Sequence, residues 1–207
     1  MINTEGHLRY LEYGQKEIDY LKMRDKKLGA AIERIGVIKR EVVPNPFTAL
    51  VFNVISQLIS KKAAQTVWSR LNALIGEITP EKIATKEVEA IQGCGISMRK
   101  AECIKGIAEA AIGGRIDFST LYLLSDKEII QKLSELNGIG VWTAEMLLIF
   151  TFNRPDVVSY NDLAIRKGIM KLYELDKLTK KDFNEYRERY SPCGSVASLY
   201  LWQISTT

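Results

Sequence analysis

The stretch of sequence that decides the fold is residues 136–144, which read Leu-Asn-Gly-Ile-Gly-Val-Trp-Thr-Ala. Gly138 and Gly140 flank a single residue, so the backbone can turn tightly here and approach another surface without Cβ atoms in the way. An amphipathic helix is predicted before the stretch, and an apolar helix that reaches Phe150 is predicted after it. The amides of Gly138, Gly140 and Val141 would then lie at a helix N-terminus, which favours a phosphate oxygen. A simple tight turn between two packed helices would also explain the two glycines.

Signals for helix starts and helix ends recur outside this stretch. Residues 125–128 read Ser-Asp-Lys-Glu, which is a capping box, and residues 179–182 open another helix in the same way. Thr79 precedes a proline at a first helical position, and a predicted helix over residues 99–112 stops at Gly113. Few long runs alternate apolar with polar residues, so strands are expected to be scarce. These patterns predict an all-α fold of roughly ten short helices.

Two joints that contain proline divide the chain. Residues 44–46 read Pro-Asn-Pro, and residues 153–155 read Asn-Arg-Pro. We therefore expect a central helical lobe formed by residues 46–154. The two termini, residues 1–45 and 155–207, are expected to form a second helical lobe.

The composition is that of an ordinary globular protein. Hydrophobic residues make up 46% of the 207 residues and charged residues 26%, and the formal net charge of +4 is compatible with DNA binding without requiring it. The three cysteines are widely spread and His7 is the only histidine, so neither a zinc site nor an iron–sulfur cluster is expected. Residues 1–13 lack the apolar core of a signal peptide, and the apolar residues 146–152 are too few to span a bilayer. We therefore expect a cytoplasmic protein that requires no cofactor.

A carboxylate follows the apolar helix at Asp162, between an extended piece of chain and a basic helix. Aspartate favours the N-cap position, so capping of this helix is one role that the sequence predicts for it. Asp156, Ser159 and Asn161 are predicted to be caps or supports of the same segment.

Residues 136–144 resemble the hairpin of the helix-hairpin-helix DNA glycosylase superfamily, which typically reads Leu-x-Gly-x-Gly-x-x-Thr-Ala. Members that also cleave the DNA backbone carry a lysine before the threonine as a Schiff-base nucleophile. Here that residue is Trp142, which is similar to the DNA-3-methyladenine glycosylase II (alkylation repair) family, where a tryptophan lines the base pocket. The resemblance extends from Pro46 to Trp202. It implies a two-lobed fold with the active-site cleft between the lobes, and a glycosylase without AP lyase activity.

In this superfamily an aspartate at the start of the helix after the hairpin is the catalytic carboxylate, and Asp162 matches its position. An alkylated purine carries positive charge and is already a good leaving group. Breaking its N-glycosidic bond leaves an oxocarbenium-like sugar, which a buried carboxylate stabilises while water attacks as the nucleophile. The resemblance thus implies a monofunctional enzyme that flips 3-methyladenine-type bases out of duplex DNA and excises them.

Base flipping needs aromatic walls for the extruded base, and an electron-rich ring also attracts a cationic methylated base. The resemblance implies Trp142 and Trp202 as walls of the base pocket. Met146 adds a softer wall one turn beyond Trp142, and Leu163 stands where some members place a tyrosine. Filling of the core is the alternative role for both tryptophans. Residues 192–195 read Pro-Cys-Gly-Ser where the family often has an aromatic–arginine pair, so either a support of the final helix or a phosphate contact is expected to be missing.

Residues 55–64 resemble the family stretch that carries the wedge, a side chain inserted into the gap that the flipped base leaves. Leu58 matches the plug, and Gln57 matches the neighbour that meets the opposing strand. Without the resemblance, Leu58 would be assigned to the core. Residues 95–101 resemble a second landmark, Gly-x-Ser-x-x-Lys-Ala, which is expected to bring another helix N-terminus close to phosphate.

Main-chain amides, hydroxyls and positive charges are expected to bind the DNA backbone, although for any single lysine a solvated surface role is the alternative. These residues are Gly138, Gly140, Val141, Thr143, Ser60, Lys62, Ser97 and Lys100. Members of the superfamily also hold a monovalent cation, Na+ or K+, through hairpin carbonyls. The corresponding carbonyls here are those of Ser134, Leu136 and Ile139.

Other functions remain compatible with the residues. The chain could be a non-catalytic helix-hairpin-helix module that binds bent DNA, a glycosylase for oxidised or mismatched bases, or a helical scaffold. The pairing of Asp162 with Trp142 argues against the first of these. The expected partner is double-stranded DNA that contains a damaged base, with no membrane, no obligate protein partner, and a monomeric chain.

Overall fold

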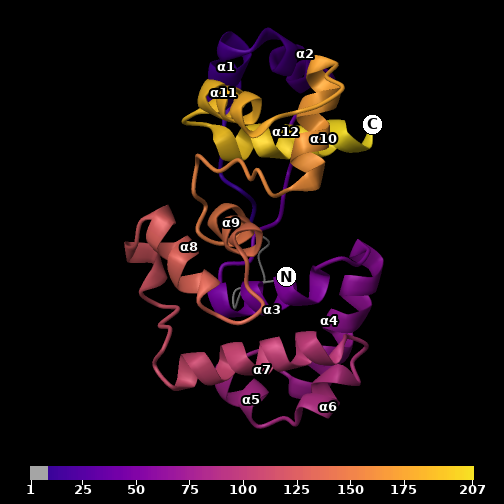
Figure 1. The fold of residues 1–207 in the computed structure, drawn as a ribbon, viewed down its shortest axis with the longest axis vertical. Coiled ribbons are helices and arrows are strands. Elements are labelled where there is room, and N and C mark those ends of the chain that lie inside the picture. Colours follow the sequence, from indigo (N-terminus) through magenta and orange to yellow (C-terminus); the bar gives the residue numbers. More distant parts are fainter. Residues whose placement is uncertain (1–8) are drawn as a thin grey trace. The chain divides into compact units, whose positions relative to one another are not determined.

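The regular structure of the chain is helical (Figure 1). The computed structural model describes residues 9–207, and within this range twelve α-helices and one 3-10 helix are formed. The β pairing described there is an isolated antiparallel bridge between Tyr10 and Glu41. The predicted all-α fold is therefore confirmed. The helices outnumber the expectation because α5 (Pro80–Ala84) and α6 (Val88–Gln92) have only five residues each.

His7 and the polar residues around it lie outside the described range. None of the helices within that range combines the length and the apolar character needed to cross a membrane. The remaining elements, in chain order, are α1 (Gln15–Arg24), α2 (Lys26–Ile35), α3 (Pro46–Ser56), α4 (Lys61–Ile75), α7 (Met98–Ile112), η1 (Leu121–Leu123), α8 (Asp126–Ser134), α9 (Val141–Phe150), α10 (Leu163–Tyr173), α11 (Lys180–Tyr190) and α12 (Gly194–Thr206).

The chain forms two compact units, and each is described by itself. The central unit is Val43–Leu147, and the terminal unit consists of the chain up to Val42 together with Leu148–Thr207. The first boundary lies beside the predicted joint at residues 44–46. The second boundary falls within α9 and not at residues 153–155, because the last residues of this helix belong to the terminal unit.

Side chains cap the helices at the positions that the sequence predicts. At the start of α8, the Ser125 amide donates to Glu128 Oε2 at 2.8 Å, and Ser125 Oγ accepts from the Glu128 amide. Thr179 and Asp182 form the same reciprocal pair at the start of α11. Thr79 caps α5. These side chains satisfy N–H groups that a helix leaves without an internal partner.

Helix α7 organises the central unit. It packs against α3, α5 and α6, and α3 packs against α4; Figure 1 shows α7 beside α5 and α6. The face of α7 that carries Ala101, Ile104, Ile107 and Ala108 is buried. The helix ends before Gly113, as the sequence predicts. A long helix with one buried face thus gives the central unit a rigid support for the turns around it.

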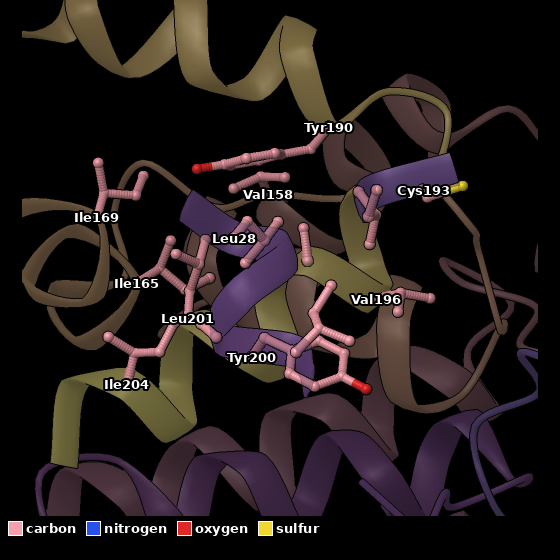
Figure 2. Close-up of a cluster of buried hydrophobic side chains, with 14 of the residues drawn as sticks. Leu28, Val158, Ile165, Ile169, Tyr190, Cys193, Val196, Tyr200, Leu201 and Ile204 are labelled. Carbon is pink, nitrogen blue, oxygen red and sulfur yellow. The ribbon is translucent and has the colours of Figure 1, made fainter. Parts of the chain in front are cut away.

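Helix α12 occupies the middle of the terminal unit, where it contacts α1, α2, α10 and α11. The core around it contains Leu28 of α2, Ile165 of α10, and Tyr200 and Leu201 of α12 (Figure 2). Helix α10 approaches α12 closely because Gly168 has no side chain. A Cβ atom at Gly168 would overlap the main chain of Leu201.

Asp25 fastens the N-terminal helices to the rest of the terminal unit. Its carboxylate is buried and caps α2, where Oδ1 accepts from the Leu28 amide at 2.9 Å. The other oxygen, Oδ2, accepts from the Tyr173 hydroxyl at 2.6 Å and from Arg189 Nη1 at 3.1 Å. A buried charge is stable only with such partners, so Asp25 joins α2 to α10 and α11.

The contact between α10 and α12 predicts opposite effects for two glycine substitutions in helices. Gly168→Ala forces a methyl group against the main chain of α12, and we expect it to lower the free energy of unfolding by about 1–3 kcal/mol. Gly106→Ala in α7 is the matched control, because a Cβ atom there meets nothing within 4 Å. It should raise the free energy of unfolding by about 0.5–1 kcal/mol through better helix propensity. Urea denaturation measures both changes, and equal effects of the two variants would contradict the close approach.

Candidate functional site

Residues 135–140 form the turn between α8 and α9. Leu136 and Ile139 are buried beneath this turn, and the Ile139 amide donates to the Leu136 carbonyl at 3.1 Å. Gly138 has a φ of +81°, in the left-handed region that favours glycine. Gly140 is exposed at the start of α9, and a Cβ atom added there would meet nothing within 4 Å. The turn therefore presents the N-terminus of α9 without side chains in the way, which is the geometry that an anion requires.

Helix α7 supports this hairpin from below through Cys103. Its thiol donates to the Asn137 carbonyl at 3.0 Å, and a Cβ atom at Gly138 would lie only 2.8 Å from the Cys103 sulfur. Burial raises the pKa of the Cys103 thiol to about 11, so the sulfur keeps its proton and remains a donor at neutral pH. Gly138 is thus required both by its backbone conformation and by the sulfur beneath it.

The main-chain carbonyls of Ser134, Leu136 and Ile139 lie at the end of α8 and in the hairpin turn. The Leu136 oxygen accepts the Ile139 amide and retains a second lone pair, which is compatible with a cation at this turn. Cation binding there stays a prediction. Within residues 9–207, no group of three histidine, cysteine, aspartate or glutamate side chains gathers as a metal site would require.

The turn between α3 and α4 holds Leu58 in an unusual state. Its φ of +58° is in the left-handed region, which costs a non-glycine residue roughly 1–2 kcal/mol. Its side chain has a relative exposure of 104%, so no burial offsets this cost. Assignment of Leu58 to the core is therefore excluded by the structure. An exposed leucine in a strained turn is the arrangement expected of a side chain that acts on a partner.

Three side-chain hydrogen bonds hold this turn, in addition to a main-chain bond from the Ile59 amide to the Ser56 carbonyl at 3.4 Å. The ammonium of Lys100, on α7, donates to the carbonyl of Ile55 at 2.8 Å and to that of Gln57 at 2.6 Å. The side-chain amide of Gln57 donates to Thr143 Oγ1 at 3.2 Å, and Thr143 is buried in the first turn of α9. Burial lowers the pKa of the Lys100 ammonium, as expected for a charge withdrawn from water. The turn at Leu58 and the hairpin helix α9 are thereby connected inside the central unit.

The other residues expected at the DNA backbone lie at or near helix N-termini of the central unit. Ser60 caps α4 by accepting from the Ala63 amide at 3.2 Å, and Ser97 caps α7 by accepting from the Lys100 amide at 3.4 Å. Lys62 is exposed in the first turn of α4. The structure thus shows that both hydroxyls serve their own helices, and their contacts to phosphate stay predictions.

Asp162 caps α10 in the terminal unit. It is 6% exposed, and its Oδ1 accepts from the amides of Ala164 and Ile165, both at 2.9 Å. The capping role that the sequence predicts is confirmed. Two amide donors on one oxygen fix the orientation of the carboxylate, and its catalytic role stays a prediction.

The segment before Asp162 is held by the start of α12. Asp156 Oδ1 accepts from the Gly194 amide at 3.1 Å. Ser195 Oγ accepts from the Val157 amide at 3.1 Å and donates to the Arg154 carbonyl at 2.6 Å. Asp156 is therefore a support, as predicted. The Pro-Cys-Gly-Ser sequence, where we expected a support of the final helix to be missing, supplies one through its last two residues.

The four residues expected to line the base pocket lie on both units. Trp202 is half-buried in the terminal unit and stacks on Phe150, with ring centroids 5.5 Å apart. Leu163 is 73% exposed next to Asp162. In the central unit, Trp142 is half-buried in the first turn of α9 and Met146 is buried. Their joint contact with a base stays a prediction.

Two internal supports of the central unit were not predicted from the sequence. Lys100 was expected to face phosphate, but its ammonium is directed at two carbonyls of its own chain. Cys103 was noted only as one of three cysteines, and it lies under the hairpin. Lys100 and Cys103 are three residues apart and therefore lie on the same face of α7. This spacing was the feature of the sequence that could have indicated a shared supporting role.

Known proteins share the fold of this chain. Residues 51–193 match the family described as "HhH-GPD superfamily base excision DNA repair protein". The chain therefore belongs to the HhH-GPD superfamily of base excision DNA repair proteins. This confirms the family resemblance of the hairpin and the DNA-repair class that it implied.

Individual relatives define the branch of the superfamily. The chain is 39% identical over 165 residues to DNA-3-methyladenine glycosylase 1 of Schizosaccharomyces pombe, over 77% of this chain and 72% of that protein. It is similar to the structure of the S. pombe 3-methyladenine DNA glycosylase in complex with abasic DNA, with a TM-score of 0.85, 34% identity, and coverage of 93% and 98% of the two chains. The structure of DNA-3-methyladenine glycosidase from Bacillus halodurans gives a TM-score of 0.82 with 34% identity, over 96% of this chain and 93% of that one.

The hairpin predicts different consequences for its two glycines. Gly138→Ala should lower the free energy of unfolding by about 1–3 kcal/mol, because it adds left-handed strain and contacts the Cys103 sulfur. Gly140→Ala should change stability by less than about 0.5 kcal/mol, since its methyl group meets no protein atom. It should nevertheless weaken duplex DNA binding about tenfold by keeping a phosphate from the α9 amides. Urea denaturation and fluorescence anisotropy measure the two effects, and unchanged binding by Gly140→Ala would indicate a simple turn.

The Cys103 thiol predicts a dependence of stability on alkaline pH. Its pKa in the folded protein lies above the ordinary value of 9.0. The contribution of the protonated thiol to stability is therefore complete below about pH 9 and is lost as the pH rises through about 11. We expect the stability difference between wild type and Cys103→Ala to shrink between urea denaturation curves at about pH 8 and about pH 11. A difference that stays constant over this range would show that the thiol does not titrate in the folded state.

Proposed function

We propose that this protein is a monofunctional DNA glycosylase that excises alkylated purines of the 3-methyladenine type from duplex DNA. The structural observation that carries the proposal is the fully exposed Leu58, held in a strained turn that is connected to the hairpin helix. A wedge of this kind is used by proteins that extrude a base from the stack. The names of the relatives support the choice of 3-methyladenine as the type of base.

The reaction needs one carboxylate and one water molecule. The alkylated purine leaves with the electrons of the N-glycosidic bond, since its positive charge makes it a good leaving group. Asp162 faces the sugar and stabilises the positive charge that develops at C1′. Water then forms the new C1′–O bond and loses a proton, which the carboxylate accepts or passes to solvent. The products are the free base and an abasic site.

Recognition of the base relies on charge and shape. Trp142 and Trp202 attract a cationic methylated purine through their π faces, a preference that neutral bases do not share. Met146 and Leu163 complete the apolar lining. Duplex DNA is bound through the amides of the hairpin turn, with phosphate at the N-terminus of α9 and a monovalent cation at the hairpin carbonyls.

Trp142 stands where glycosylases with lyase activity carry their nucleophilic lysine. An indole nitrogen cannot form a Schiff base with C1′. The reaction of this protein therefore ends at the abasic site, and the DNA backbone stays intact until alkali is added.

Base release from methylated duplex DNA by wild type and Asp162→Asn tests the proposal. Asparagine keeps the oxygen that caps α10 and removes the charge, so the variant should fold with nearly unchanged stability. We expect it to release bases at least about a hundredfold more slowly than wild type. Strand breaks should appear only after alkali treatment in both cases.

Asp25→Asn is the matched control, because Asp25 is also a buried carboxylate that caps a helix of the terminal unit. It should lower stability and leave base release intact. Release by Asp162→Asn at the wild-type rate would refute the catalytic role. Strand breaks without alkali would refute the absence of lyase activity. DNA binding without release of any base by wild type would instead indicate a non-catalytic module or a different lesion.

A further inference from the structure

The end of α3 leaves carbonyl groups that its own helix cannot satisfy. The last carbonyls of any helix lack internal donors, and the negative end of the helix dipole lies there. In α3 these carbonyls lead directly into the strained turn at Leu58. The ammonium of Lys100 supplies the donors, with bonds of 2.8 Å to Ile55 and 2.6 Å to Gln57.

The position of Lys100 makes this support stiff. Its helix, α7, is anchored in the central unit because one face of the helix is buried there. The second tie of the turn, from the Gln57 amide to Thr143, reaches the hairpin helix. Because the Leu58 side chain contacts solvent, the conformation of the turn depends on the bonds of the neighbouring residues, which are those of Lys100 and Gln57 and the longer main-chain bond from Ile59 to Ser56.

We propose that Lys100 is a positioning residue for base flipping, which acts through Leu58 by holding the wedge turn and does not act through a phosphate of the DNA. The inference rests on the proposed function, in which Leu58 fills the gap left by the flipped base. Two of the three ammonium protons of Lys100 are donated to carbonyls of the protein, so the ammonium already has partners in the protein without DNA. A turn held in this way is ready to insert Leu58 without first being ordered.

Lys105 provides a matched control on the same helix. It is half-buried like Lys100, and its ammonium also donates to two carbonyls, those of Lys86 at 2.6 Å and Ala84 at 3.4 Å. Those carbonyls belong to the last residue of α5 and to the turn that follows it, where no DNA contact is predicted. Lys100→Met and Lys105→Met therefore remove the same kind of bond from one helix.

The experiment compares single-turnover base release from methylated DNA in double-stranded and in heat-denatured form. Only the double-stranded form requires a wedge. We expect Lys100→Met to slow release from the duplex about tenfold and from single strands by less than about twofold. Lys100→Arg, which keeps a charged donor, should recover most of the duplex rate. Lys105→Met should affect the two forms equally.

Two further measurements separate positioning from phosphate binding. The double variant Leu58→Ala/Lys100→Met should release bases from duplex no more slowly than Leu58→Ala alone, because Lys100 acts only through the leucine. The salt dependence of duplex binding by Lys100→Met should equal that of wild type. A salt slope reduced by about one, equal losses on both forms of DNA, or additive effects in the double variant would overturn the inference.

Hydrogen exchange distinguishes failure of this inference from failure of the proposed function. Lys100→Met should accelerate amide exchange in residues 57–60, and Lys105→Met should not. If wild type released no base from either form of DNA, the proposed function would fail. The role of Lys100 in holding the turn would then be tested by amide hydrogen exchange and by the salt dependence of duplex binding alone. Unchanged amide exchange of residues 57–60 in Lys100→Met would overturn that role.

Discussion

A lysine ammonium shared by two carbonyl oxygens at the end of α3 is the interaction on which the exposed turn of the central unit depends. Helix ends need donors for their last carbonyls, and a leucine in the left-handed region needs its neighbours to be fixed. The side chain of Leu58 can neither donate to these carbonyls nor fix its neighbours by packing, because it lies in solvent. The stabilisation comes from α7, where the buried helix face holds Lys100 in place.

The same helix holds the second turn of the central unit. Cys103 follows Lys100 by three residues, which places both on one face of α7. One residue anchors the turn before α4, and the other supports the hairpin before α9. The Gln57–Thr143 bond then ties the two turns together. Displacement of α7 would therefore disturb both turns at once.

In the terminal unit, the carboxylate of Asp162 and the first turn of α10 fix each other. Asp162 satisfies two orphan amides of α10, and those amides keep its carboxylate in one orientation. The extended segment that leads to it is fastened to α12 through Asp156 and Ser195. Both amides bind the same oxygen, Oδ1, so the cap and the orientation of the group depend on one pair of bonds. The close contact of α10 with α12 at Gly168 fixes the helix that Asp162 begins.

The sequence could predict the parts of this protein that depend on local interactions. Capping at Ser125, Thr179 and Asp162 was predictable because a cap joins residues only two or three positions apart. The helical class and the hairpin at Gly138 were predictable for the same reason. The second boundary between the units was not predictable. It lies within α9, because the last residues of this helix pack with the terminal unit, and it does not lie at the proline joint of residues 153–155.

By itself, then, the sequence determined the helices and the hairpin turn, since each follows from residue type and short spacing. The candidate carboxylate and tryptophans came from the resemblance of these motifs to a known family. Only the tertiary structure decided the roles of Lys100, Cys103 and Ser195, whose partners lie more than thirty positions away along the chain. A long side chain on a helix has no preferred partner until the chain is folded. The direction of the Lys100 ammonium, toward its own carbonyls, was therefore fixed by packing and not by the motif that contains it.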